Sequence, residues 1–246
     1  MKTMQKFVPG EACLHLFLAA VSPLQGMLDR PGVTHEFCNL QALQILRSDG
    51  YSRYADFLGR YQRELTLGVY WADKGWKNIH HYYEPTSGRG LWNFAGAIDQ
   101  FAVYYRLALR TLRQGDKSRA AFLIGAAAHL VQDLCVPHHA RAKMFDGHKQ
   151  YESWAATNCA DYAVAARGVY GEGKAAFGLL EANAAVAADF LGDVCREGDE
   201  AGYRRATAVL LPLAQRTTAG LLWRFAAAAE AGAVMTAAGK AGLAVA

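Results

Sequence analysis

The sequence predicts an all-α fold, arranged as a single compact domain of many helices. Alanine is abundant, proline is scarce at six residues and β-branched runs are short, a composition that favours helix throughout. Apolar residues recur three or four positions apart in most segments, as on the buried face of a helix. Hydrophobic residues make up 52% of the 246, which is enough to bury a large core.

Residues typical of helix starts and helix ends predict the first two helices. After Pro31-Gly32, Thr34 is expected to cap a helix that begins near His35 and ends at Asp49-Gly50. A second helix is expected over residues 51–68. Residues 68–90 are predicted to be a loop, because Gly, Trp, Tyr and His are concentrated there, and long loops of this kind are often functional.

The rest of the chain is predicted to be helical with short breaks. Gly115-Asp116 separates two helices, and Asp116 or Ser118 is expected to cap the second of them, which runs towards Pro137. Pro212 is expected to kink the last helix. The expected helices span residues 91–114, 116–137, 148–166, 175–197 and 200–231.

The two ends are expected to lie outside the domain, which is placed at residues 28–235. Residues 1–27 have the outline of an export or leader segment, with lysines before an apolar run, although Glu11 and His15 interrupt it. Export and a cytoplasmic location therefore both stay open. Residues 236–246 are expected to be an Ala/Gly tail, and no segment is apolar for long enough to span a membrane.

Charge and cysteine content narrow the function classes only slightly. The net charge of +4 suits a phosphate-bearing substrate and equally a solvated surface. The five cysteines are scattered without CxxC spacing, which argues against a disulfide framework or a thiolate zinc site and favours buried apolar thiols.

A cluster of ionisable residues is the most informative feature of the chain. An apolar run at residues 120–128 precedes it, so its first two members are predicted to lie in a buried helix. An unpaired polar group there would cost roughly 2–7 kcal/mol, and a charge more, so bound metal ions are expected. The neighbouring His138 is expected to face solvent. The members are His129, Asp133, His139, His148 and Glu152.

Spacing sorts these residues into two sets of ligands. His129 and Asp133 lie four positions apart, so on a helix they share one face and can hold one ion. The carboxylate of Asp133 can also bridge to a second ion. His139, His148 and Glu152 supply two nitrogens and an oxygen, a set suited to zinc with an open position for water or substrate.

The same motifs resemble the signature of the zinc-dependent phospholipase C family and of the related P1/S1-type nucleases. The order His-x3-Asp-x3-Pro-x-His, followed by His-x3-Glu, carries the resemblance over residues 129–152. Upstream, His81-Tyr82-Tyr83-Glu84-Pro85 is similar to the family's His-aromatic-Tyr-Asp-Pro loop. Residues 68–73 resemble its Tyr-Pro-Asp segment, and Thr34-His35 resembles its first ligand pair. The resemblance implies that family's all-α fold, with residues 28–235 as the catalytic domain.

It also implies two or three zinc ions. A third ion would take His35 and the bridging Asp133, and in the family an N-terminal tryptophan completes that site. No tryptophan precedes His35 here, so either Asp29 substitutes or the centre holds two ions only. Glu64 and Glu84 compete with Asp73 for its place. The first ion would be held by Asp73, His81, His129 and Asp133, and the second by His139, His148 and Glu152.

The implied reaction is hydrolysis of a phosphodiester, in which a phospholipid is cleaved to diacylglycerol and a phosphorylated head group. Zinc would lower the pKa of a bound water and screen phosphate charge, and Asp73 is the candidate to orient or deprotonate that water. Several aromatic residues are candidates to contact a choline-like head group by cation–π attraction, or else simply pack the loop. They are Tyr70, Trp71, Trp76, Tyr82 and Tyr83.

Two other functions stay open. A P1-like nuclease acting on single strands and 3′-nucleotides shares the central motif, but usually has a longer insertion before its last histidine and ends in aspartate. The short 139–148 gap and Glu152 favour the phospholipase. The third hypothesis is a non-catalytic helical metal-binding protein. The phospholipase prediction includes a monomeric chain, a phospholipid at a membrane surface as partner and, from the family, a secreted or periplasmic location; nucleic acid is a partner only under the nuclease alternative.

Overall fold

The computed structural model confirms the all-α prediction. It describes residues 32–171, 175–196 and 199–243. Across these ranges it contains helices and no strand, with one isolated bridge between Glu84 and Arg89. The helices are α2 (Val33–Ser48), α3 (Ser52–Gly59), α4 (Gln62–Ala72), η1 (Gly75–His80), η2 (Leu91–Asn93), α5 (Ala97–Arg113), α6 (Lys117–Asp133), α7 (Pro137–Ala140), α8 (His148–Asn158), η3 (Cys159–Tyr162), α9 (Gly178–Ala187), η4 (Ala188–Phe190), α10 (Leu191–Val194) and α11 (Glu200–Leu243).

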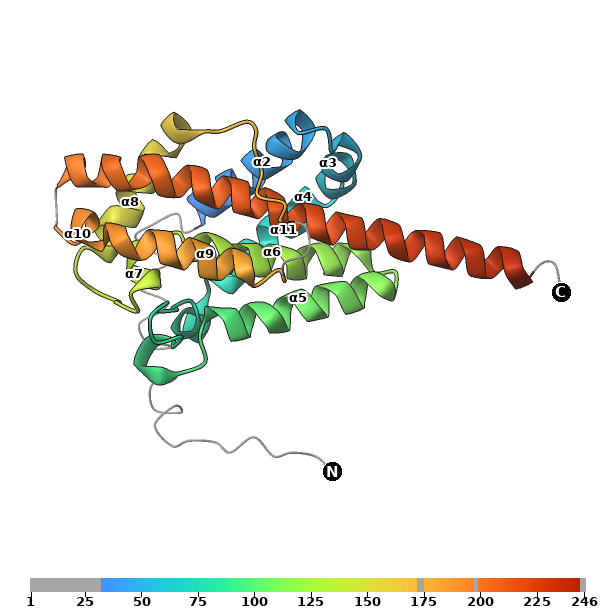
Figure 1. Cartoon of the computed structure of the whole chain (residues 1–246), viewed down its shortest axis with the longest axis horizontal. Coiled ribbons are helices and arrows are strands. Elements are labelled where there is room, and N and C mark those ends of the chain that lie inside the picture. Colours follow the sequence, from blue (N-terminus) through green and yellow to red (C-terminus); the bar gives the residue numbers. More distant parts are fainter. Residues whose placement is uncertain (1–31, 172–174, 197–198, 244–246) are drawn as a thin grey trace, which may run out of the picture.

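Helix α6 runs through the middle of the fold (Figure 1) and packs against α4, α5 and α11. Its residues 124–133 are all buried, and their Ala-rich sequence lets neighbouring helices approach closely. Two glycines mark the closest approach. A Cβ on Gly68 of α4 would lie 2.0 Å from the Phe122 carbonyl oxygen, and one on Gly125 would lie 2.2 Å from the Leu65 carbonyl oxygen. Helices α4 and α6 therefore cross in backbone contact.

The longest described helix, α11, runs the length of the molecule and extends past the other helices at its C-terminal end (Figure 1). It packs on α2, α6 and α9. The short helices α7, α8 and α10 lie at the opposite end of the molecule (Figure 1). The segment with the densest ligand motif is therefore gathered at one end of the bundle.

The ends of two helices test the capping predictions. Helix α2 begins at Val33 and is preceded by Gly32, with no side-chain cap, so the expected role of Thr34 is wrong. Gly32 has a φ of 88°, and a Cβ there would lie 2.3 Å from the Tyr70 ring, so the turn needs glycine. The cap at Asp116 is confirmed, because its carboxylate accepts the Arg119 N–H at 2.9 Å.

Three predicted helix boundaries are wrong, because tertiary contacts determine where these helices begin and end. The expected loop at 68–90 begins as helix, because α4 continues to Ala72 against α6, and η1 follows. The expected helix at 91–114 is interrupted: Trp92 within η2 has a φ of 50°, and α5 begins only at Ala97. The region 175–197 divides into α9, η4 and α10.

Other predicted helix boundaries also differ from those in the structure. The expected helix at 148–166 ends at Tyr162 as α8 and η3. Helix α11 continues through Pro212 to Leu243, so residues 236–243 of the expected tail are helical. The predicted export segment at 1–27 and the alternative ligand Asp29 lie outside the described residues. Within the described ranges, no helix combines the length and apolarity needed to cross a bilayer.

Candidate metal centre

The eight predicted metal ligands come together at one place, although they are spread from residue 35 to residue 152. They lie on α2, at the end of α4, after η1, and on α6, α7 and α8. Their ligand atoms form three groups, each with its atoms within 4.8 Å of one another. The groups are His35, His129 and Asp133; Asp73, His81 and His129; and His139, His148 and Glu152.

Asp133 lies at the middle of the centre and is 2% exposed. Its Oδ2 lies 2.8 Å from His81 Nδ1 and 3.1 Å from His129 Nε2. Its Oδ1 lies 3.4 Å from His35 Nε2. The two carboxylate oxygens therefore face different imidazoles, which is the geometry of a bridging carboxylate.

These contacts fit ligands of a metal better than partners in hydrogen bonds. Although two ring nitrogens lie within 3.1 Å of Asp133 Oδ2, no described group meets that buried oxygen with hydrogen-bond geometry. A buried carboxylate oxygen without a partner is costly unless a cation satisfies it. Imidazole nitrogens with carboxylate oxygens form a donor set that zinc prefers. The residues present therefore fit zinc.

Burial and mutual attraction set the protonation states of the centre. Burial lowers the pKa of His129 to about 4, so the ring is neutral at pH 7. Burial raises the pKa of Asp133, but the attraction of His129, His139 and His81 outweighs it and holds the pKa well below its usual range. A neutral imidazole beside an ionised carboxylate is the combination that binds a divalent cation.

The second ligand set is built by α7 and α8. Glu152 Oε1 lies 2.9 Å from His148 Nε2 and 3.4 Å from His139 Nε2. The outer nitrogen of each ring meets a backbone carbonyl: His139 Nδ1 lies 3.2 Å from the His81 oxygen and His148 Nδ1 lies 3.4 Å from the Met144 oxygen. Such outer contacts fix the tautomer and leave Nε2 free for a metal.

His138 does not face solvent, and that prediction is wrong. The residue is fully buried, and its ring stacks on His148 with centroids 4.7 Å apart and an interplanar angle of 18°. Its Nε2 donates to the Asp146 carbonyl oxygen at 2.9 Å. Burial lowers its pKa to about 4, so the ring stays neutral.

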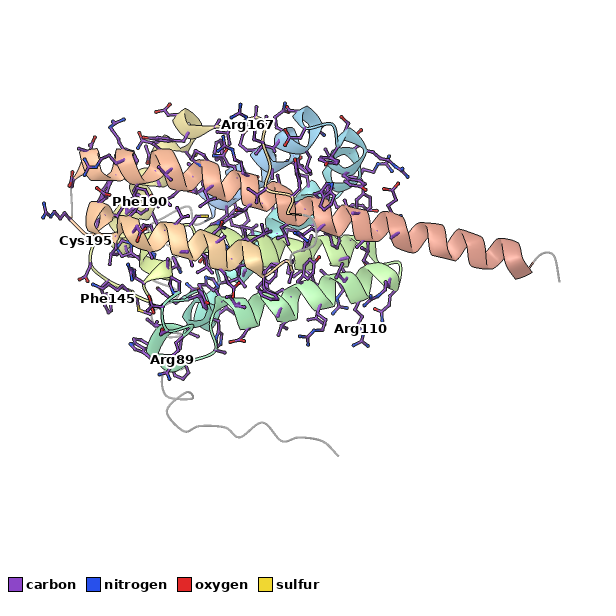
Figure 2. All side chains as sticks on the ribbon, viewed as in Figure 1. Arg89, Arg110, Phe145, Arg167, Phe190 and Cys195 are labelled. Carbon is purple, nitrogen blue, oxygen red and sulfur yellow. The ribbon has the colours of Figure 1, made fainter. Side chains whose placement is uncertain are left out.

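The loop between α7 and α8 contacts two of these histidines and also reaches the surface. Its carbonyls at Met144 and Asp146 meet His148 and His138, as described above. Between them, Phe145 is 74% exposed and points away from the molecule at the end where α7 lies (Figure 2). The backbone turns sharply here, with a φ of 61° at Asp146. One short loop therefore carries both ligand supports and an exposed aromatic side chain.

The aromatic residues predicted to contact substrate lie in two different parts of the structure. Tyr82 is buried and stacks on His139, with ring centroids 4.6 Å apart, and Tyr83 follows it half-buried. Trp71 instead packs against Tyr104 and Phe122, away from the ligand groups. Tyr70 donates its hydroxyl hydrogen to Glu36 at 2.7 Å. For Trp76, only the backbone, in η1, is described.

The two carboxylates expected to compete with Asp73 have other partners. Glu84 accepts the backbone N–H groups of Thr86 and Ser87 at 3.1 and 2.7 Å. Glu64 accepts the Ser118 hydroxyl at 3.3 Å. Of the three, only Asp73 belongs to a ligand group.

Comparison with known proteins agrees with this centre. The family model described as zinc dependent phospholipase C matches residues 34–201. The chain belongs to the zinc-dependent phospholipase C family. The resemblance predicted from the ligand motifs is thereby confirmed, and with it a zinc-dependent centre as the cofactor site.

Individual relatives match parts of the chain. A phospholipase C of Bacillus cereus is 30% identical over 92 residues, which are 34% of this chain and 32% of that protein. The alpha toxin of Clostridium absonum superposes with a TM-score of 0.69 at 19% identity, covering 78% of this chain and 62% of the toxin. The alpha-toxin of an avian Clostridium perfringens strain gives 0.66 at 19% identity, with the same coverage. The chain thus spans about a third of the first relative and less than two thirds of the toxins, and the toxins establish the fold alone.

Proposed function

We propose that this protein is a zinc-dependent phosphoric diester hydrolase that cleaves a phospholipid to diacylglycerol and a phosphorylated head group. The observation that carries the proposal is the gathering of eight predicted ligands, from six segments, at one place where the buried Oδ2 of Asp133 has no hydrogen-bond partner among the described residues. Membership of the zinc-dependent phospholipase C family supports it. We assign the catalytic domain to residues 28–235.

The ligand groups define which residues would hold zinc. Asp73, His81, His129 and Asp133 form one set, His139, His148 and Glu152 form another, and His35 with Asp133 offers a third. Zinc bound at such ligands lowers the pKa of a coordinated water and screens the negative charge of the phosphate. The surrounding imidazoles keep Asp133 ionised, so its two oxygens stay available as ligands.

Asp73 is the residue we assign to the attacking water. Its side chain is 28% exposed at the C-terminal end of α4, and its Oδ1 lies 3.9 Å from His129 Nε2. Asp133, in contrast, is buried among imidazoles, with only 2% of its surface exposed. A partly exposed carboxylate beside the ligands can accept a hydrogen bond from water and take its proton.

The substrate side is assigned from the chemistry around the centre. We propose a phospholipid presented at a membrane surface, hydrolysed by a monomeric chain. Tyr82 and Tyr83 are the aromatic candidates nearest the ligands, because Tyr82 stacks directly on His139. Tyr70 and Trp71 stay as more distant candidates for substrate contact. The nuclease alternative is not favoured, since the family model and the Bacillus cereus relative are both phospholipases C.

Two measurements on purified protein test the proposal. Metal analysis should find at least two zinc equivalents per chain, and a protein that binds none would overturn it. Release of phosphocholine from short-chain lecithin should exceed hydrolysis of single-stranded DNA, whereas the reverse preference would favour the nuclease. The His129→Ala variant should lose both zinc and turnover, because His129 belongs to two of the ligand groups.

A further inference from the structure

His35 can act as a metal ligand only if its hydrogen sits on the correct ring nitrogen. Its Nε2 faces Asp133 Oδ1 at 3.4 Å, and its ring lies 4.2 Å from the ring of His129. A neutral imidazole carries one hydrogen, and the nitrogen that carries it cannot bind a cation. Nε2 is therefore a ligand only when the hydrogen is on Nδ1.

The side chain that meets His35 Nδ1 is Gln132. Its Oε1 lies 2.8 Å from that nitrogen. The amide is 3% exposed and its nitrogen end is already used, donating to Asn39 Oδ1 and Thr218 Oγ1, each at 3.0 Å. These contacts come from α2 and α11, two helices that also pack against each other. The oxygen end of the amide is thereby held towards His35.

We propose, on the basis of the zinc centre proposed above, that Gln132 is a positioning residue that holds the hydrogen of His35 on Nδ1 and opens Nε2 to a metal. An amide oxygen only accepts hydrogen bonds, so the ring nitrogen facing it must donate. His35 and Asp133 then supply ligands of a third metal group from side chains on α2 and α6.

Helix spacing explains how Gln132 can contact both His35 and Asn39. His129, Gln132 and Asp133 occupy positions i, i+3 and i+4 of α6 and share one face. His35 and Asn39 are four apart on α2, so one of them meets the oxygen of Gln132 and the other its nitrogen. The same amide thus orients a ligand and ties α2 to α6. Loss of such a support around a metal ligand typically weakens metal binding by about 10- to 100-fold.

Two variants at this position separate the hydrogen-bond acceptor from the packing. In Gln132→Leu the acceptor for His35 is gone, so one zinc equivalent should bind about 10- to 100-fold more weakly in competition with a chelator. Gln132→Glu keeps an oxygen facing Nδ1, although it loses the donor to Asn39 and Thr218, and should retain more zinc than Gln132→Leu. Equal zinc binding by wild type and Gln132→Leu, or equal loss in both variants, would overturn the proposal.

Gln215→Leu is the matched control. Gln215 is also fully buried, donates to the carbonyl oxygens of Tyr162 and Leu211, and accepts the Val164 N–H, but it touches no ligand. Its variant should keep the zinc content. If a wild-type chain bound no zinc at all, the proposed function would fail; if it bound zinc regardless of residue 132, only the role of Gln132 would fail.

Ring-nitrogen NMR of the wild-type protein gives a readout that needs no variant. With ¹⁵N-labelled histidine, the spectrum of zinc-loaded protein should show His35 with its hydrogen on Nδ1. Gln132→Leu should shift that signal towards the other tautomer, and Gln132→Glu should not. A wild-type His35 with its hydrogen on Nε2 would overturn the proposal even if Gln132→Leu failed to fold.

Discussion

At the scale of single residues, the centre depends on groups that the ligand motif does not include. Sequence spacing predicted the candidate ligands, because helix geometry places positions i and i+4 on one face. It missed His138, whose burial depends on a stack with His148 across a chain turn. A residue's partners across a turn are not encoded in its own periodicity, so only the folded chain reveals them.

The stack between His138 and His148 leads to a prediction for metal binding. His138→Ala removes both the ring contact and the bond to the Asp146 carbonyl oxygen. Zinc should then bind about 10- to 100-fold more weakly at His139, His148 and Glu152, as measured by chelator competition. His138→Phe keeps the stacked ring and should lose less. Identical affinities in wild type and both variants would show that the stack does not support the ligand.

A second residue, Asp49, predicts a dependence of stability on pH. Its carboxylate accepts the N–H groups of Arg167 and Gly168 and the Tyr170 hydroxyl, at 2.9, 2.8 and 2.6 Å. Burial raises its pKa, but these hydrogen bonds lower it further, and the net pKa is below the usual value. Stability from such a group is present above the unfolded pKa, near 4, and is lost as pH falls through the lower folded pKa.

Asp49→Asn should therefore lower the free energy of unfolding by about 1–3 kcal/mol at pH 7. The difference from wild type should shrink as the pH is taken below about 4 in urea denaturation. Asp56→Asn is the control, since Asp56 makes only an exposed ion pair with Arg47 at 3.5 Å. A difference between wild type and Asp49→Asn that stays constant with pH would contradict the assignment.

At the scale of elements, the crossing of α4 and α6 sets the position of Asp73. The sequence predicted the ligand pair on α6 but placed residues 68–73 in a loop. Local composition, rich in Gly, Trp and Tyr, favoured the loop, whereas the backbone contact at Gly68 and Gly125 keeps the segment helical to Ala72. The contact lies between residues far apart in sequence, which is why single-chain periodicity could not predict it.

Adding a methyl group at this crossing tests its importance. In Gly125→Ala the new Cβ would lie 2.2 Å from the Leu65 carbonyl oxygen, so α4 must move away from α6. Overpacking of this kind costs about 1–3 kcal/mol or more, and zinc affinity should fall because Asp73 follows α4. Gly192→Ala, where no atom lies within 4 Å of the new Cβ, should be close to neutral. Calorimetry and zinc titration of both variants check this, and equal behaviour would count against the crossing.

At the scale of the whole molecule, the proposed ligands come from segments between α2 and α8. The fold class and the family could be predicted, and so could the candidate ligands that the structure brings together, because the all-helical pattern and the spaced motifs are local properties of the chain. The division of residues 175–197 into α9, η4 and α10 could not, because it depends on what those helices pack against.

Removal of metal should therefore destabilise the entire fold. One site saturated to about 100 times its dissociation constant adds about 2.7 kcal/mol. For a chain of this size, that corresponds to a fall in Tm of about 5–10 °C when a chelator is added. His129→Ala should show a much smaller response to chelator. A melting temperature that does not change when the chelator is added would indicate that the centre carries no metal in solution.

The two ends of the centre differ in their access to water. The side chain of Glu152 is 43% exposed, whereas that of Asp133 is 3% exposed. Zinc held beside Glu152 would therefore lie nearer to solvent than zinc held beside Asp133, where only Asp73 and His35 are partly exposed. The two ions should then exchange with external zinc at different rates, faster at the Glu152 end.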